Sequence, residues 1–151
     1  MSGVPNTPPP LAPDQARDFF ARYRDAFNAG DAAAVAALWH ESSAIADAPD
    51  GVARLSCWPE PAAMRANMAA LCRVYAELGP HAWSFELREG RPLGAHHFFA
   101  DVEWSLRRAS GELLQRFGTG YQLGRTAQGW RVLFCCAYQE DLTETRKHAA
   151  E

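Results

Sequence analysis

Asp47 is the side chain of this sequence whose setting most clearly suggests proton chemistry. It lies in the run SSAIADAPDG (42–51), where small and apolar residues lead into a turn. Residues two apart on a strand share a face, so Asp47 shares one with Ile45, which is expected to point inward. Desolvation raises the pKa of a carboxyl group in an apolar interior, which suits a general base near neutral pH. The alternative is that Asp47 only caps the turn that follows it.

Tyr23 is the second candidate, because a phenol can stabilise a developing enolate. It lies between Phe20 and Phe27 at helical spacing, within an apolar stripe. One interpretation is a packed aromatic ring whose hydroxyl finds a single partner. If the hydroxyl instead points into a pocket, one such donor contributes about 3 kcal/mol, by analogy with other oxyanion holes. An acid and a phenol of this kind together can enolise a carbonyl compound, which is also the first step of an aldol-type cyclisation.

The other polar residues give no second catalytic cluster. His96 and His97 are neighbours on a predicted strand, so their side chains point to opposite faces. Asp101 and Glu103 fall on the outward set of the same strand. The four cysteines include no C-x-x-C pair, and no histidine has the spacing of a zinc ligand, so neither a metal site nor a cofactor is expected.

Large apolar side chains on the predicted helices and strands are expected to form the core. Where the core encloses a pocket, the same side chains contact the ligand. The candidates for ligand contact are Trp39, Met64, Met68, Phe98, Val102, Trp104, Phe117 and Tyr121.

Composition excludes several classes of partner. The 151 residues are 48% hydrophobic, with a formal net charge of −3 and with basic residues scattered singly or in short pairs. This pattern argues against nucleic acid and against anionic membranes. The first residues have neither a basic segment nor an apolar segment of a secretion signal, and no apolar run approaches the ~20 residues of a membrane span. With its cysteines interpreted as free thiols, the protein is predicted to be cytoplasmic.

Apolar periodicity predicts three helices and five strands. Pro13 and Asp14 suit the first turn of a helix that Gly30 ends, and Asp31 suits the cap of a second helix whose inner face includes Trp39. The segment APDGVARLSCWPEP (48–61) holds Pro and Gly at turn positions. The predicted helices are 14–29, 31–40 and 60–78, and the predicted strands are 42–47, 82–89, 95–108, 112–124 and 129–139.

This order predicts an α+β domain over 13–140, in which four long antiparallel strands and one short strand wrap around three helices. Residues 1–12 are expected to be a disordered lead-in and 141–151 a tail. The outer face of the sheet mixes apolar with charged residues, which predicts a homodimer through that face. The residues assigned to it are Phe99, Asp101, Glu103, Leu114 and Arg116.

Two segments carry a resemblance to a known superfamily. ARYRDAFNAGDAAAVAALWHESSAIAD (Ala21 to Asp47) and GTGYQLGRTAQGWRVLFC (Gly118 to Cys135) resemble the opening block and the closing hairpin of nuclear transport factor 2-like proteins. The resemblance implies a cone-shaped fold around a pocket. The opening block is most similar to the SnoaL-like and ketosteroid isomerase-like members.

In ketosteroid isomerases a helical tyrosine donates to the oxyanion and an aspartate ending the first strand removes the proton. The resemblance places Tyr23 and Asp47 on these positions, and therefore implies a cofactor-free isomerase or cyclase acting on an apolar carbonyl compound. Those enzymes add a protonated aspartate on a later strand, and no acid occurs between Thr119 and Tyr121. The alternative is a non-catalytic ligand-binding or dimerisation module of the same fold.

Overall fold

The structure is a computed structural model that describes residues 7–141. The chain forms three helices and six strands in this range. They are α1 (Pro13–Asn28), α2 (Ala32–Ala36), β1 (Trp39–Asp47), β2 (Arg54–Trp58), α3 (Pro61–Ala76), β3 (His81–Leu93), β4 (His97–Arg108), β5 (Leu113–Thr126) and β6 (Gly129–Asp141). Half of the predicted lead-in at 1–12 and almost all of the predicted tail at 141–151 lie outside the described residues.

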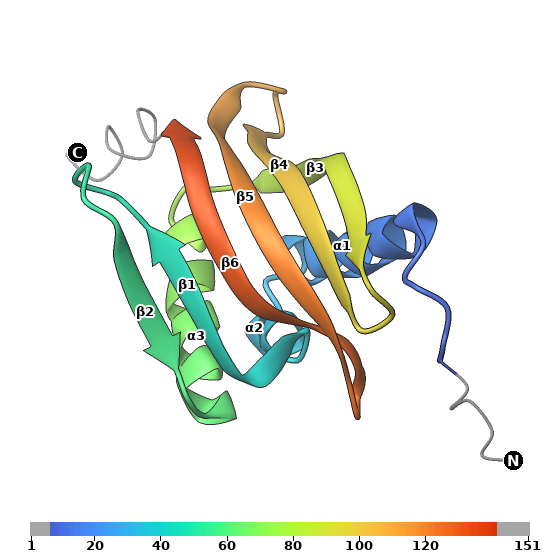
Figure 1. The fold of residues 1–151 in the computed structure, drawn as a ribbon. Coiled ribbons are helices and arrows are strands. Elements are labelled where there is room, and N and C mark those ends of the chain that lie inside the picture. Colours follow the sequence, from blue (N-terminus) through green and yellow to red (C-terminus); the bar gives the residue numbers. More distant parts are fainter. Residues whose placement is uncertain (1–6, 142–151) are drawn as a thin grey trace, which may run out of the picture.

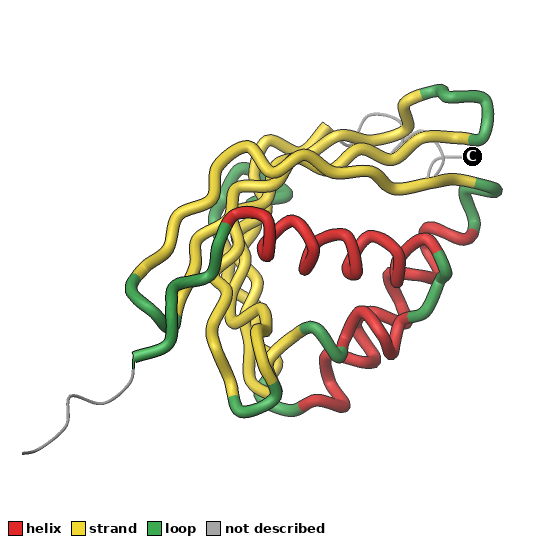
Figure 2. The backbone as a smooth tube through the Cα atoms, turned by 90° about the vertical axis from the view of Figure 1, so that its right-hand side faces the viewer, coloured by secondary structure: helices red, strands yellow, loops and turns green. Residues whose placement is uncertain are grey.

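All six strands belong to one sheet in the order β2-β1-β6-β5-β4-β3. Neighbouring strands are antiparallel except β1 and β6, which are parallel. The sheet curls over the helices, with α1 and α3 on its concave side (Figures 1 and 2). The predicted α+β class and curved sheet are confirmed, and the parallel pairing of β1 with β6 is the feature that the predicted all-antiparallel sheet did not include.

Helix α1 begins and ends where the sequence predicts. Pro13 occupies the first turn, and the Gln15 side chain accepts a hydrogen bond from the Ala12 N–H at 2.8 Å. Gly30 follows the helix with a φ of 65°, a conformation that glycine adopts without a Cβ clash. The buried face includes Phe20 and Tyr23, which fixes both rings against the sheet.

Two elements differ from the sequence-based expectation. Arg54–Trp58 is a strand, β2, where turn chemistry was expected, because its five residues pair with Ser43–Asp47 of β1. Trp39 starts β1 instead of continuing a helix. The carbonyl of Leu38 accepts the Val132 N–H at 2.8 Å, so pairing with β6 replaces helical hydrogen bonds at this point.

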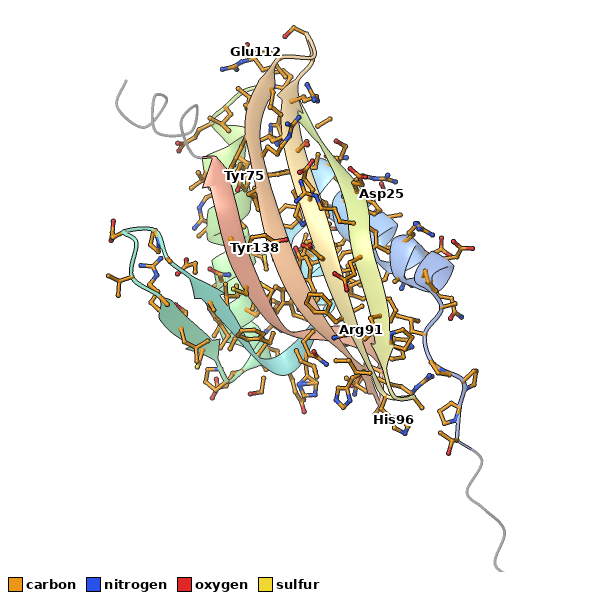
Figure 3. All side chains as sticks on the ribbon, turned by 45° about the horizontal axis from the view of Figure 1, so that its top comes forward. Asp25, Tyr75, Arg91, His96, Glu112 and Tyr138 are labelled. Carbon is orange, nitrogen blue, oxygen red and sulfur yellow. The ribbon has the colours of Figure 1, made fainter. Side chains whose placement is uncertain are left out.

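The inner and outer faces of β4 differ as alternation predicts. Its inward side chains Phe98, Val102 and Leu106 have no exposed surface. Outward, Glu103 pairs with Arg88 and Arg116, and the Tyr138 hydroxyl donates to Asp101 (Figure 3). Leu114, expected on the outer face, is buried at 2% exposure, because a register shift in the pairing of β4 with β5 turns it inward.

No helix within residues 7–141 is long and apolar enough to cross a membrane. The same part of the chain brings together no group of three or more His, Cys, Asp or Glu side chains that could hold a metal ion.

Candidate functional site: an aromatic cavity under the sheet

A cavity of about 130 Å³ lies between the concave face of the sheet and helices α1 and α3. Its wall contains aromatic, aliphatic and small polar side chains, and no charged one. The lining residues are Tyr23, Phe27, Trp39, Ile45, Asn67, Met68, Leu71, Tyr75, Trp83, Trp104, Phe117, Thr119, Tyr121, Cys135 and Ala137.

Two tyrosines on this wall are each held by a tryptophan. The Trp39 indole N–H donates to the Tyr23 hydroxyl oxygen at 3.1 Å. Between strands β4 and β5, the Trp104 indole N–H donates to the Tyr121 hydroxyl oxygen at 2.8 Å. An indole N–H can only donate, so each phenol oxygen acts as an acceptor and keeps its own proton for another partner.

The two phenols also contact each other. The Tyr23 and Tyr121 rings meet in a T-shaped arrangement, with their centroids 6.0 Å apart. The two indole hydrogen bonds use neither phenol proton, so each hydroxyl can donate to a ligand. Because each oxygen already accepts an indole N–H, the remaining O–H is polarised and donates more strongly in this low-dielectric setting.

Burial keeps the titratable groups on the wall neutral. Burial is the largest cause that raises the pKa of Tyr23 and of Tyr121 above their ordinary value of 10.0. The pKa of Cys135 rises to about 12, first through burial and then through the neighbouring Cys136 and Asp47 charges. The phenols are therefore hydrogen-bond donors at neutral pH, and Cys135 is a protonated thiol with little nucleophilic character.

Asp47 lies outside the lining of the cavity. Its two carboxylate oxygens accept from the Arg54 guanidinium, Oδ1 from Nε at 2.6 Å and Oδ2 from Nη2 at 3.1 Å. The side chain of Asp47 is 25% exposed, and by strand alternation it is on the same face of β1 as Ile45. Its charge contributes to the raised pKa of Cys135, so the carboxylate lies near the cavity wall without forming part of it.

The turn after β1 is closed without the Asp47 side chain, by a hydrogen bond from the Gly51 N–H to the Ala48 carbonyl at 3.1 Å. Capping of this turn therefore does not account for the position of the carboxylate, and its partner is Arg54 across the β1–β2 pair.

The other residues singled out from the sequence divide into two groups. Trp39, Met68, Trp104, Phe117 and Tyr121 line the cavity together with Tyr23. The structure places Met64, Phe98 and Val102 elsewhere in the core, each at most 1% exposed and none on the cavity wall.

Sequence reasoning did not single out several residues of the wall. Tyr75 and Leu71 belong to the apolar stripe of α3, and Trp83 belongs to the alternating pattern of β3. The periodicity of each element therefore predicts only that these side chains point inward. No sequence pattern identifies which inward residues border empty space. The Trp83 indole N–H is buried and has no hydrogen-bond partner within residues 7–141, which adds a further donor to the wall.

The sequence of the chain matches the model of a known protein family. A family profile described as "NTF2-like protein (DUF6841)" matches residues 14–140. The chain belongs to this NTF2-like family. No curated protein matches the chain.

Solved structures similar to this NTF2-like chain show the same fold. An NTF2-like protein with a cystatin-like fold from Novosphingobium aromaticivorans is 21% identical with a TM-score of 0.66, covering 89% of this chain and 86% of its own. A cystatin-like domain of unknown function from Nostoc punctiforme is 15% identical with a TM-score of 0.65, covering 91% and 82%. A ketosteroid isomerase-like protein from Erwinia carotovora is 16% identical with a TM-score of 0.57, covering 84% and 96%. At these identities the similarity establishes the fold alone.

Proposed function

We propose that the protein binds a small, neutral carbonyl compound in the aromatic cavity, with the Tyr23–Tyr121 pair donating a hydrogen bond to the carbonyl oxygen. The observation that supports this proposal is the arrangement of the two phenols. Each accepts an indole N–H, so the pair has a proton to donate and its oxygens already have partners. A ligand that offers an acceptor is therefore favoured over one that only donates.

The volume of the cavity limits the size of the ligand. An engineered apolar cavity of about 150 Å³ in another protein binds benzene, whereas drug-sized ligands occupy about 300–1,000 Å³. At about 130 Å³, this cavity matches a single ring with a short substituent. A steroid would extend well beyond this volume, so a monocyclic ketone is the better match.

The chemistry of the wall favours a neutral ligand. No charged side chain is among the lining residues, and transferring an ion from water to such an environment is strongly unfavourable. The unpaired indole N–H of Trp83 lies on the same donor-rich wall. An apolar ring with one or two carbonyl oxygens satisfies these conditions.

A matched pair of probes tests the proposal. Acetophenone and α-methylstyrene have nearly the same shape, but only acetophenone has a carbonyl oxygen. We expect acetophenone to bind more tightly by about tenfold, which is the effect of one buried hydrogen bond of about 1.5 kcal/mol. Titration followed by tryptophan fluorescence measures both, because Trp39 and Trp104 are on the wall.

Three tyrosine-to-phenylalanine variants each remove one phenol hydroxyl, at three different positions. Tyr23→Phe and Tyr121→Phe are expected to reduce the preference for acetophenone while leaving α-methylstyrene binding unchanged. Tyr138→Phe is the control, because its hydroxyl contacts Asp101 on the outer face. Equal affinity of the two probes for the unmodified protein, or equal effects of all three variants, would contradict the role of the phenol pair.

A second candidate function is proton transfer beside the carbonyl, with Asp47 as the base and Tyr23 as the oxyanion donor. The observation that favours it is the position of the carboxylate, which shares a β1 face with Ile45 and contributes to the raised pKa of Cys135. For this reaction the Arg54 guanidinium has to leave at least one carboxylate oxygen. The resulting enolate oxygen would accept the hydrogen bond that the phenol pair offers.

A further inference from the structure

A second hollow lies beside the aromatic cavity, on the other side of Trp39. It has a volume of about 240 Å³ and is enclosed by α2, the start of β1, the first turns of α3 and the hairpin between β5 and β6. Figure 1 shows α2 and the start of β1 close together at this end of the sheet. Trp39 lines both spaces, so its buried side chain separates the hollow from the cavity.

Three basic side chains from three different elements line this hollow. They are His40 of β1, Arg65 of α3 and Arg131 of β6. We refer to these residues and the space that they enclose as the basic hollow. Glu41 is the single acidic residue that lines the basic hollow, and it is an exposed residue of β1.

The two guanidinium groups of the basic hollow have no carboxylate partner. Among residues 7–141, neither Arg65 nor Arg131 forms an ion pair, whereas arginines such as Arg17, Arg54 and Arg108 pair with acids. The polar contact of Arg131 is a hydrogen bond from Nη1 to the Trp130 carbonyl at 2.7 Å. Positive charge therefore collects in this space although the whole chain has a formal charge of −3.

The start of α3 adds to this charge. Pro61 is at the first position of the helix and lines the hollow, and the Glu60 side chain does not cap the helix. Among residues 7–141 no side chain caps the start of α3, so the positive end of its dipole adds to the charge at this wall. This feature supports an anion at the site that the arginines define.

We propose that the basic hollow binds an oxyanion, the phosphate or carboxylate group of a small molecule. A guanidinium presents its N–H groups in a planar fork that matches two oxygens of such a group. Two guanidiniums and an imidazole on three elements can surround one oxyanion. The space holds a small anion with some of its water, and the proposal does not depend on what the aromatic cavity binds.

Titration with inorganic phosphate and with succinate, at constant ionic strength set with chloride, tests this proposal. Two-dimensional amide NMR spectra of the full chain follow the binding. We expect saturable shifts confined to the residues around His40, Ala62–Arg65 and Gln128–Arg131. Comparison of the two probes decides whether phosphate or carboxylate is preferred.

Charge variants identify the groups responsible. Arg65→Gln and Arg131→Gln are each expected to weaken binding about tenfold, and Glu41→Gln to strengthen it, because it removes the opposing charge. Arg73→Gln is the control, since Arg73 is an exposed arginine about two turns further along α3 and does not line the hollow. Circular dichroism verifies that each variant is folded.

Phosphate also stabilises many proteins without binding to a site, so stabilisation alone does not support the proposal. The proposal would be overturned by chemical shift changes that spread over the whole surface or do not saturate. It would also be overturned if a double variant, Arg65→Gln with Arg131→Gln, bound both probes as tightly as the unmodified protein. Loss of acetophenone binding has no bearing on these outcomes, so failure of the two proposals can be distinguished.

Discussion

Asp47 and Arg54 form the contact that decides whether proton transfer is possible at this site. Strand alternation in the sequence predicts the face on which Asp47 lies, and the register of β1 agrees with it. The partner could not be predicted, because Arg54 belongs to a segment whose proline and glycine residues indicate a turn. Alternation along β1 therefore predicts the face on which the Asp47 side chain lies, whereas pairing with β2 decides which side chain it contacts.

Exchange of hydrogen for deuterium at the methyl group of acetophenone measures enolisation without knowledge of the natural substrate. If Asp47 is a base, the protein accelerates this exchange in D2O and Asp47→Asn abolishes the acceleration. Tyr23→Phe is expected to slow it by about 10²-fold or less, because Tyr121 remains to donate. Proton NMR follows the loss of the methyl signal.

The control for this experiment is Arg54→Gln, which frees the carboxylate and keeps a polar side chain of similar reach. It is expected to increase the exchange rate if the ion pair restrains the base. If acetophenone binds but its methyl group exchanges at the same rate with and without the protein, Asp47 is excluded as a base for this ketone. The proposed binding function would be unaffected by that result.

The hydrogen bonds of the phenol pair illustrate a second limit of sequence reasoning. The helical stripe marks Tyr23 as inward, and alternation marks Trp104 and Tyr121 as inward. Their pairings join residues 16 and 17 positions apart on different elements. Period predicts which residues point inward, and only packing in three dimensions decides which donor meets which acceptor.

At the scale of elements, the long strands and the helices α1 and α3 were predictable, whereas strand β2 and the point where α2 ends were not. Strands β3 to β6 have 12 to 14 residues each, which gives many repeats of the period-two pattern. Strand β2 and helix α2 have five residues each, and tertiary hydrogen bonds decide their conformation. The pairing of Leu38 with Val132 ends the helical segment that residues 31–40 favour by themselves.

The pairing of β5 with β6 depends on Gly118, which leaves room for the Tyr138 ring. A Cβ atom added at Gly118 would lie 2.8 Å from Cζ of Tyr138. Gly118→Ala is therefore expected to lower the free energy of unfolding by about 1 kcal/mol, at the low end of overpacking costs, because the Tyr138 ring can shift only by straining its hydrogen bond to Asp101. Urea unfolding measures this change.

The double variant Gly118→Ala, Tyr138→Ala is the control for this prediction. The second substitution removes the ring that the new methyl group would meet, so the two effects are expected to be non-additive, with Gly118→Ala costing less in the Tyr138→Ala background. Additive effects would show that the ring of Tyr138 does not restrict position 118.

At the scale of the whole molecule, the curled sheet surrounds an aromatic interior while its outer face has paired charges. The predicted homodimer remains a proposal for that outer face, where Phe134 of β6 is 36% exposed. The NTF2-like architecture was predictable because its two diagnostic segments lie at the two ends of the chain. The residue-level function was not, because related folds contain different side chains around the same cavity.

Ionisation inside this interior links the stability of the whole molecule to pH. Burial raises the pKa of Cys135 from 9.0 to about 12, and it also raises those of Tyr23 and Tyr121 above 10.0. Above pH 9 the unfolded chain therefore loses protons that the folded chain retains. The contribution of Cys135 to stability is complete below pH 9 and is lost as the pH rises towards 12, at up to about 1.4 kcal/mol per pH unit.

Urea unfolding between pH values of about 7 and 10 detects this loss through its slope. Cys135→Ala is expected to reduce the slope that begins near pH 9, because the variant has no thiol to ionise in the unfolded chain. Cys57→Ala, which removes an exposed thiol, is the matched control for a cysteine-to-alanine substitution. If the slope of Cys135→Ala were as steep as that of the unmodified protein, this thiol would ionise as readily in the folded protein as in water. The wall of the cavity would then not be the dry environment on which the choice of a neutral ligand rests.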